Sequence, residues 1–528
     1  MNIRSSSDES TPVLIVGGGL AGLSAAMFLA WRGVETVLVE KHPGSSPHPR
    51  AIGFTTRTLE LFRAVGVGAS IPEVPLGHGR PRRVAVESLA GKWSAEAEWT
   101  PGKPQNGKPD GPPRSASSYS PCTGASIAQD KLEPILRDKA IELGADVRLN
   151  TELLSLEEDG TGVLASLRHR DGREYALRAS YVIAADGHAS PVRDALGIGR
   201  SGHGFLQVVR SVLFCAPLDE YLESGVSQFE LDQPGLKGML TTYRDGRWLL
   251  MFSDDQERDL ATLRAKVIQA IGRSDLDVEI ITTGRWTLSA LIADRFSSGH
   301  VFLAGDAAHT LPPARGGYGA NTGIEDSYNL AWKLASVLSG SSSRELLDTY
   351  DAERRPIAWL RHDQIFARQD YAKWATDDEK KVAIIEDDAM ELGQLYRSKS
   401  VLGAGEELPP ALRPEQWAGQ PGTRAPHLWV STRGEQVSTL DLLQHHWVLV
   451  TDSEVWCEAA AQAIKRVGLK VECLHIGGAA FGIGPEGASL VRPDGYVAWR
   501  SLELPADPAA ALTAALTEVA CLTRALRA

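Results

Sequence analysis

Residues 301–334 read VFLAGDAAHTLPPARGGYGANTGIEDSYNLAWKL, and this stretch decides the fold. Its first four residues are apolar and predict a short buried strand. Gly305 and Asp306 follow, so the strand ends with a carboxylate at its tip. A turn rich in proline and glycine leads to residue 322, after which apolar side chains recur every three or four positions and predict a helix. Carboxylates accept hydrogen bonds from sugar hydroxyls and helix N-termini attract anions, so the stretch predicts a cofactor site.

A second motif, near the front of the chain, predicts a dinucleotide site. Residues 12–16 predict a buried strand, and GGGLAG at 17–22 fits the pattern GxGxxG ahead of an apolar helix. A second strand, 36–39, ends at Glu40, which follows Gly22 by 18 residues. The same glycine string recurs at 197–202 and 482–487 without these neighbours, so we predict a single dinucleotide fingerprint.

Each residue type in this fingerprint has a physical role. Gly17 permits the tight turn, Gly19 lets the backbone approach a pyrophosphate, and Gly22 lets the helix pack closely on the strand. Glu40 accepts hydrogen bonds from ribose hydroxyls. The predicted nucleotide contacts are Gly17, Gly19, Leu20, Ala21, Gly22, Glu40 and Lys41.

Length and charge limit the classes to which this protein can belong. The chain has 528 residues, enough for several domains with full cores. A net charge of −12 and the lack of a long basic run argue against a nucleic-acid partner. Residues 12–31 carry no charge and are long enough to span a bilayer, but glycines interrupt them, so we predict no membrane segment.

The cysteines give a further prediction. They are few, widely scattered and without a CxxC or metal-ligand spacing, so we predict reduced thiols, no metal centre and a cytoplasmic protein. The five are Cys122, Cys215, Cys457, Cys473 and Cys521.

Taken in order, the motifs resemble those of the class A flavoprotein aromatic hydroxylases, the family of para-hydroxybenzoate hydroxylase and phenol hydroxylase, and most closely the aromatic polyketide hydroxylases. The resemblance implies that Asp306 holds the ribityl chain of FAD and that the turn 313–321 lies along the isoalloxazine ring. The family has a glycine soon after the two prolines, whereas here Ala314 and Arg315 intervene. Arg315 stabilises anionic flavin or an acidic substrate, or else faces solvent.

The resemblance also implies roles for other single residues. Arg50 matches the family residue that contacts the FAD pyrophosphate, and Gln129 matches its flavin-contacting glutamine. Asp186 belongs to a DG motif implicated in FAD and nicotinamide-cofactor binding. The flavin turn contributes Pro313, Gly319, Ala320 and Asn321.

The pattern and the resemblance together predict an α/β fold with a Rossmann-like FAD-binding domain, an inserted antiparallel-sheet substrate domain and a C-terminal thioredoxin-like domain. Alternating apolar residues between 200 and 290 predict the inserted sheet. The predicted bounds are 1–195 and 290–400 for the FAD-binding domain (343–400 helical), 196–289 for the substrate domain, 401–427 for a linker and 428–528 for a thioredoxin-like domain without CxxC.

Aromatic and flexible side chains on the inserted sheet are candidates for a substrate pocket, because flat rings stack well. We expect only two or three to touch substrate among Phe229, Met239, Tyr243, Trp248 and Trp286. Candidates for assisting deprotonation of a phenol are Arg315, Tyr243 and His309, with a packing or flavin-side role favoured for His309. The Pro- and Gly-rich loop 101–120 either covers the pocket or is a plain insertion.

The resemblance implies a reaction cycle. NADPH or NADH reduces FAD, reduced flavin and O2 form a C4a-hydroperoxide, and a phenolic, polycyclic polyketide-type substrate takes one oxygen atom. Two alternatives remain open: Baeyer–Villiger oxidation of a polycyclic ketone, and a flavin-binding interaction protein without turnover. The expected protein is a monomer or homodimer.

Overall fold

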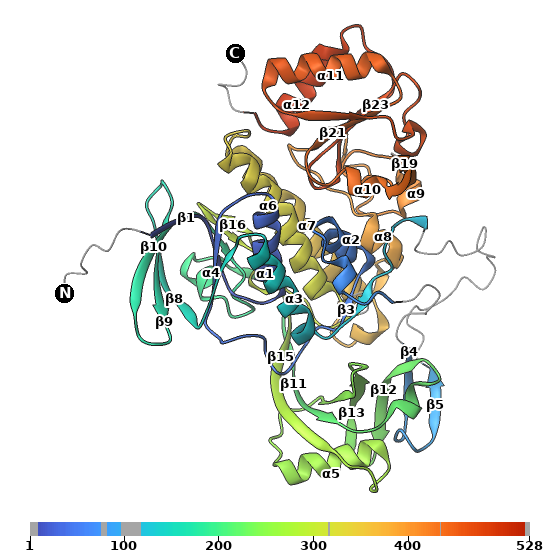
Figure 1. Ribbon diagram of the computed structural model, residues 1–528. Coiled ribbons are helices and arrows are strands. Elements are labelled where there is room, and N and C mark those ends of the chain that lie inside the picture. Colours follow the sequence, from blue (N-terminus) through green and yellow to red (C-terminus); the bar gives the residue numbers. More distant parts are fainter. Residues whose placement is uncertain (1–8, 75–81, 97–117, 315–316, 433, 523–528) are drawn as a thin grey trace.

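The computed structural model describes residues 9–74, 82–96, 118–314, 317–432 and 434–522 (Figure 1). Two eight-stranded sheets and one four-stranded sheet organise these residues. Residues 101–117 of the predicted loop, and Arg315, lie outside the described residues.

The first sheet is the parallel sheet predicted by the two motifs. Its strands are β1 (Glu9–Val16), β2 (Thr36–Glu40), β7 (Asp146–Leu149), β8 (Thr151–Glu158), β9 (Val163–His169), β10 (Glu174–Ala184), β16 (Ser297–Ser298) and β17 (Val301–Leu303). The path is β16–β17–β10–β1–β2–β7, and the five strands from β17 to β7 run parallel. Val13, Leu14 and Ile15 in β1 are completely buried, as expected for a strand covered on both faces.

Helices pack around this sheet and bring the two motifs together. They are α1 (Leu20–Trp31), α2 (Thr56–Ala64), α3 (Gln129–Glu142), α4 (Pro191–Ala195), α6 (Tyr318–Leu338) and α7 (Glu345–Phe366). The long helix α6 lies against α1. Gly323 allows α6 to approach the tip of β17, since a Cβ atom there would lie 2.9 Å from the Cα of Gly305. The start of α6 therefore sits beside the acidic strand tip.

The second sheet lies below the first in Figure 1 and runs in the order β18–β15–β11–β14–β13–β12–β4–β5. Its strands are β4 (Arg82–Val86), β5 (Trp93–Glu96), β11 (Arg200–Cys215), β12 (Val226–Gln233), β13 (Leu236–Thr242), β14 (Arg247–Phe252), β15 (Glu279–Ala293) and β18 (His309–Thr310). The sheet includes β4 and β5, which our prediction placed in the nucleotide-binding domain. One face packs on α5 (Leu260–Ile271) around a core of its own.

The C-terminal part has a βαβ unit followed by ββα, the order of a thioredoxin-like domain. Parallel β21 (Trp447–Thr451) and β22 (Val471–Leu474) are linked by α11 (Glu454–Val467). Antiparallel β23 (Ala488–Val491) and β24 (Val497–Ser501) precede α12 (Pro508–Val519), which packs against α11. Smaller elements, here and elsewhere, are β3 (Gly53–Phe54), β6 (Ala125–Ser126), α8 (Asp387–Leu392), α9 (Pro414–Trp417), β19 (Trp429–Thr432), β20 (Glu435–Ser438) and α10 (Thr439–Leu442).

Two predictions for this part are corrected. Segment 401–427, predicted as a linker, packs into the structure, because Trp417, Arg424 and Ala425 are buried. Cys457 and Cys473 form a disulfide between α11 and β22, whereas we predicted that all five cysteines are reduced. Sequence spacing could not show this pair, since strand and helix bring together residues that lie 16 positions apart. Among the described residues, no helix is long and apolar enough to cross a membrane.

A buried ion cluster joins the C-terminal domain to the first. Arg492, between β23 and β24, donates to both carboxylate oxygens of Glu353 on α7, at 2.6 and 3.0 Å. Lys333 and Asn329 on α6 donate to the same carboxylate, at 2.8 and 2.7 Å. Burial alone would raise the pKa of Glu353, but Arg492 and Lys333 hold that pKa well below its usual range. Glu353 therefore stays charged and ties three segments together.

Replacing Arg492 should loosen this junction. In Arg492→Met the charge of Glu353 stays buried with fewer donors, which costs about 3–5 kcal/mol for a broken buried ion pair. We expect a lower urea midpoint and faster proteolysis within 401–427. The control is Lys381→Met, whose ion pair with Asp378 is exposed and should leave both readouts unchanged. An unchanged midpoint in Arg492→Met would show that the cluster does not hold the domains.

Candidate active site

The turn between β1 and α1 forms a cradle that only glycine fits. Gly17 has a φ of +106°, and a Cβ atom on it would lie 2.3 Å from the carbonyl oxygen of Ala185. A Cβ atom on Gly22 would lie 1.9 Å from the carbonyl oxygen of Gly17. No described side chain caps the N-terminus of α1, and its first turn contains no acidic residue. Its backbone N–H groups are therefore suited to a phosphate.

Glu40 closes one side of this cradle. Its carboxylate accepts a hydrogen bond from the Gly18 N–H at 2.6 Å and from the His42 N–H at 2.8 Å. The side chain is thus fixed at the end of β2, beside the glycine turn. Its predicted contact with ribose, and that of the exposed Lys41 next to it, stay predictions.

The chain brings a cation and an anion together across the site. Nη1 of Arg50 lies 3.8 Å from Oδ2 of Asp306, and both side chains are partly exposed. Gln129, the first residue of α3, accepts from the backbone N–H groups of Arg50 and Ala51 at 3.4 and 3.3 Å. Gln129 in turn donates to Glu133 at 2.7 Å. Arg50, Asp306 and Gln129 therefore lie close together.

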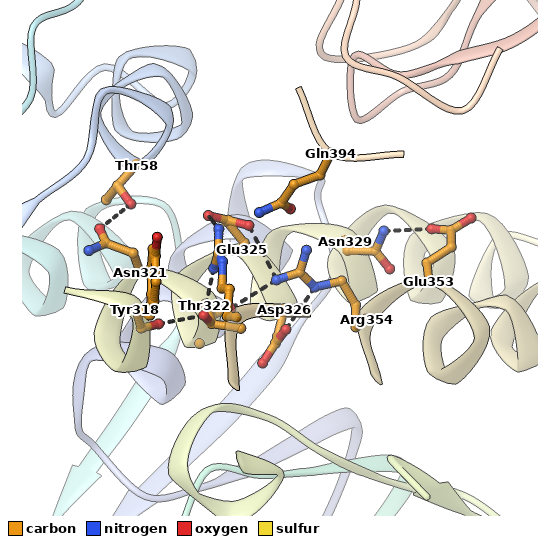
Figure 2. A network of polar contacts seen from close by, with 12 residues as sticks. Thr58, Tyr318, Asn321, Thr322, Glu325, Asp326, Asn329, Glu353, Arg354 and Gln394 are labelled. Atoms are coloured by element: carbon orange, nitrogen blue, oxygen red, sulfur yellow. Dashed lines mark hydrogen bonds and ion pairs between the residues drawn. The ribbon is translucent and has the colours of Figure 1, made fainter. Parts of the chain in front are cut away.

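The N-terminus of α6 is a second candidate anion site. Gly317 precedes the helix with a φ of +58°, and no described side chain caps it. Asn321, fully buried, fixes this end: its Oδ1 accepts from the Thr58 hydroxyl at 2.6 Å and its Nδ2 donates to the Gly317 carbonyl at 2.8 Å (Figure 2). Asn321 therefore braces the turn, while Gly319 and Ala320 lie half-buried in the first turn of the helix. Tyr371 holds the turn from outside by donating to the carbonyl of Pro313.

Asp326 on α6 fixes the acidic strand tip formed by Gly305 and Asp306. It is fully buried and accepts from the Gly305 N–H at 3.2 Å, from Nε2 of His309 at 2.7 Å and from Nε of Arg354 at 2.7 Å. Figure 2 shows Asp326 and Arg354 facing each other within the polar network of α6 and α7. Burial opposes the charge of Asp326, but His309 and Arg354 keep its pKa below the usual range. His309 is itself buried in this contact, in keeping with the packing or flavin-side role favoured for it.

Asp186 is engaged in a similar way at the end of β10. Its carboxylate accepts from the Ser190 hydroxyl at 2.6 Å and from the Val192 N–H at 3.1 Å, at the start of α4. Burial raises the pKa of Asp186. Its predicted part in cofactor binding stays a prediction.

The alternation of side chains along the strands places the predicted pocket residues on two different faces of the second sheet. Phe229 and Trp248 are completely buried in the core against α5, so the structure contradicts their assignment to the pocket. Met239 pairs with Met251 on the opposite face. Trp286 and Met251 pack on that face against a cluster that includes Tyr318 at the start of α6. Met239 and Trp286 stay candidates for substrate contact.

Tyr243 has a structural partner. Its hydroxyl donates to the carbonyl of Pro49 at 2.6 Å, and burial raises its pKa above the usual value. The structure therefore argues against Tyr243 as a proton acceptor. It anchors the segment that carries Arg50 to the second sheet.

The structure adds His48 to the candidate site. Nε2 of His48 lies 2.9 Å from the hydroxyl of Ser211 on β11, on the sheet face that also carries Met251. A Cβ atom on Gly284 would lie 2.7 Å from that nitrogen, so glycine makes room for the ring. Burial, and next the charge of Arg50, lower the pKa of His48. Sequence reasoning missed His48 because Ser211 is 163 residues away.

Comparison with known proteins settles the family. Residues 10–364 match the family model for an FAD binding domain, and residues 418–521 match the C-terminal domain of the aromatic-ring hydroxylases. The chain belongs to the FAD-dependent aromatic-ring hydroxylases. The predicted family, fold class and FAD cofactor are thereby confirmed, and a nicotinamide electron donor is typical of this family.

Individual relatives match almost the whole chain. A 4-methyl-5-nitrocatechol 5-monooxygenase from Burkholderia sp is 38% identical over 97% of this chain and 98% of its own. A tetracenomycin A2 monooxygenase-dioxygenase from Streptomyces glaucescens is 38% identical over 98% of both chains. The structure of aklavinone-11 hydroxylase with FAD and aklavinone has a TM-score of 0.85, with 36% identity, covering 98% of this chain and 100% of that one. The enzyme is an aromatic monooxygenase, as predicted.

The residues present fit FAD. Two helix N-termini offer backbone N–H groups, Arg50 offers a cation to a diphosphate, and Asp306 offers an acceptor for hydroxyl groups. A Cβ atom on Gly305 would lie 2.8 Å from the side chain of Ala21, so the acidic tip sits against the first turn of α1. The two parts of the fold that suit the two ends of FAD are therefore adjacent.

Asp306→Ala should weaken FAD binding. Loss of charge-assisted hydrogen bonds costs about 1.5–3 kcal/mol, which is roughly a 10- to 100-fold higher Kd. The measurement is a fluorescence titration of the apoprotein with FAD. Asp378→Ala, which removes an exposed carboxylate, serves as the control and should bind FAD like the parent. An unchanged Kd in Asp306→Ala would remove this residue from the cofactor site.

Proposed function

We propose that this enzyme hydroxylates a phenolic ring of a polycyclic, polyketide-type substrate, with NADPH or NADH as the electron donor and O2 as the oxygen source. The observation that carries the proposal is an apolar cluster where the second sheet packs against the start of α6. Buried Leu206, Val209 and Leu288 belong to the same cluster as Tyr318. Half-buried side chains extend it on both sides: Met251, Trp286, Leu311, Ala314 and Trp374.

The partly buried edge of this cluster suits a flat, extended aromatic molecule. It combines flexible methionine and aromatic side chains from the sheet with apolar residues of the turn that we assign to the flavin ring. The relatives support large substrates, since one is named for tetracenomycin and a solved one holds aklavinone. The nitrocatechol relative, with equal identity, favours a second candidate, a single substituted ring.

In this proposal the chain positions the reactants and keeps water out. FAD supplies the electron transfer and the activation of O2. Arg50 and the N-terminus of α1 bind its diphosphate, and Asp306 binds its ribityl hydroxyls. Backbone N–H groups at Gly319 and Ala320 stabilise negative charge on the ring. The apolar cluster would keep water out of the site.

We propose that His48 accepts the phenol proton. Its lowered pKa keeps the imidazole neutral at pH 7, so a ring nitrogen is available as an acceptor. Ser211, in contact with His48, lies on the sheet face that fronts the turn and passes the proton between substrate and imidazole. Removing the proton makes the phenolic ring a stronger nucleophile toward the transferred oxygen.

His48→Gln should lower kcat by about 10²-fold or more, the usual contribution of a general base. Because burial lowers the pKa of His48, the parent should lose activity only at a pH below the ordinary imidazole value of about 6.5, and the variant should lack this acid limb. The measurement is the pH profile of product formation at saturating NADPH, with equal FAD content in both proteins. A parent-like rate and profile in His48→Gln would refute the role of His48.

The substrate proposal is tested with a panel of polycyclic phenols, polycyclic ketones and substituted catechols. We expect a polycyclic phenol to accelerate NADPH oxidation by the holoenzyme and to gain one oxygen atom, located by NMR on a ring carbon. Acceleration by catechols alone would favour the single-ring candidate. A lactone product would establish Baeyer–Villiger oxidation, and oxidation of NADPH that no compound accelerates would contradict the proposal.

A further inference from the structure

Three potential metal ligands meet in the C-terminal domain at the junction of α11 and β22, and the carboxylate of Glu454 lies beside one of them. Glu454 and Cys457 are three residues apart in the first turn of α11, so their side chains share one helix face. Cys473 lies in β22, and His475 follows Leu474, the last residue of that strand. The ligand atoms of these two residues lie close together beside Cys457.

Their spacing matches a tetrahedral zinc site. The ligand atoms of Cys457, Cys473 and His475 all lie within 4.8 Å of one another. Sγ of Cys457 lies 3.5 Å from Nε2 of His475, and the same nitrogen lies 3.8 Å from Oε1 of Glu454. Zn–S and Zn–N bonds of about 2.3 and 2.0 Å in a tetrahedron place sulfur about 3.5 Å from nitrogen and about 3.8 Å from a second sulfur. The disulfide must open for the two sulfurs to separate to this spacing, and the exposed Glu454 side chain must turn toward them to complete the site.

We propose that the reduced Cys457–Cys473 pair, with His475 and Glu454, binds one zinc ion. A dithiol reductant gives two electrons and two protons to the disulfide, yielding two thiols while the reductant becomes a disulfide. Zn²⁺ then displaces both thiol protons and binds two thiolates, the His475 imidazole and the Glu454 carboxylate. The site alternates between a covalent link and a metal link, each joining α11 to β22.

The surroundings suit this exchange. Both sulfurs are half-buried and His475 is exposed, so a reductant and a metal ion can reach them. Thiolate and imidazole ligands favour zinc over magnesium or calcium, which prefer oxygen. The aromatic hydroxylation assigned to the FAD site uses none of these residues, so this site is independent of the proposed function.

The test uses Co²⁺ as a spectroscopic substitute for zinc. The full-length holoenzyme is reduced with a dithiol, freed of reductant without air, and titrated with Co²⁺, while an oxidised sample is treated in parallel. We expect the reduced protein alone to bind one Co²⁺ per chain, with thiolate-to-cobalt charge transfer and tetrahedral d–d bands. Zinc should displace the cobalt and raise the Tm of the reduced protein.

Variants separate the metal site from the disulfide. His475→Gln keeps the disulfide yet should weaken Co²⁺ binding about tenfold or more, whereas Cys473→Ser should abolish the charge-transfer band. The matched control is Cys215→Ser, which removes a partly exposed free thiol on β11 and should bind like the parent. Equal binding by oxidised and reduced parent, no stoichiometric binding after reduction, or parent-like binding by His475→Gln would each overturn the proposal. If Cys473→Ser misfolds, His475→Gln and the reduced parent still decide the outcome.

Discussion

The structure depends on one buried carboxylate, that of Asp326. A charged group in a dry interior is stable only if donors surround it, and Asp326 has the Gly305 N–H, His309 and Arg354. These donors come from the turn after β17 and from α7. The hydrogen bonds that these donors make to Asp326 therefore fix the position of the strand tip and of the start of the turn. They also fix the packing of α6 on α7. The position of Asp306, and with it the proposed flavin contact, follows from this arrangement.

The same helix pair extends the constraint to the rest of the chain. On α7, Arg354 faces Asp326, while its neighbour Glu353 faces Arg492 of the C-terminal domain. Arg354 also donates to the hydroxyl of Tyr396 at 2.7 Å. Adjacent side chains on one helix thus connect the cofactor turn with the thioredoxin-like domain. We infer that this domain supports the FAD-binding domain through packing, because the Glu353–Arg492 ion pair is buried and satisfied and Trp332 shares an apolar cluster with Trp447.

Much of this fold follows from local sequence patterns, and the errors have identifiable physical causes. The glycines at 17 and 22 were predictable, since each meets a strict backbone requirement. The acidic tip at Asp306 was predictable because it follows a short apolar strand. The faces of Phe229 and Trp248 were not, because an aromatic residue in an alternating strand fits either side of a sheet. Contacts between residues far apart in the sequence, such as that of His48 with Ser211, cannot be predicted from the local sequence pattern. The joining of β4 to the second sheet is a long-range pairing of the same kind.

A crystal structure of the holoenzyme with FAD would test the central claim most directly, which is that Asp326 holds the turn and Asp306 in place for the flavin. We predict hydrogen bonds from the ribityl hydroxyls to the Asp306 carboxylate and from the N–H groups of Gly319 and Ala320 to the flavin ring, with the contacts of Asp326 to Gly305, His309 and Arg354 unchanged. A flavin bound away from the start of α6, or an Asp326 carboxylate that leaves these donors when FAD binds, would contradict the account.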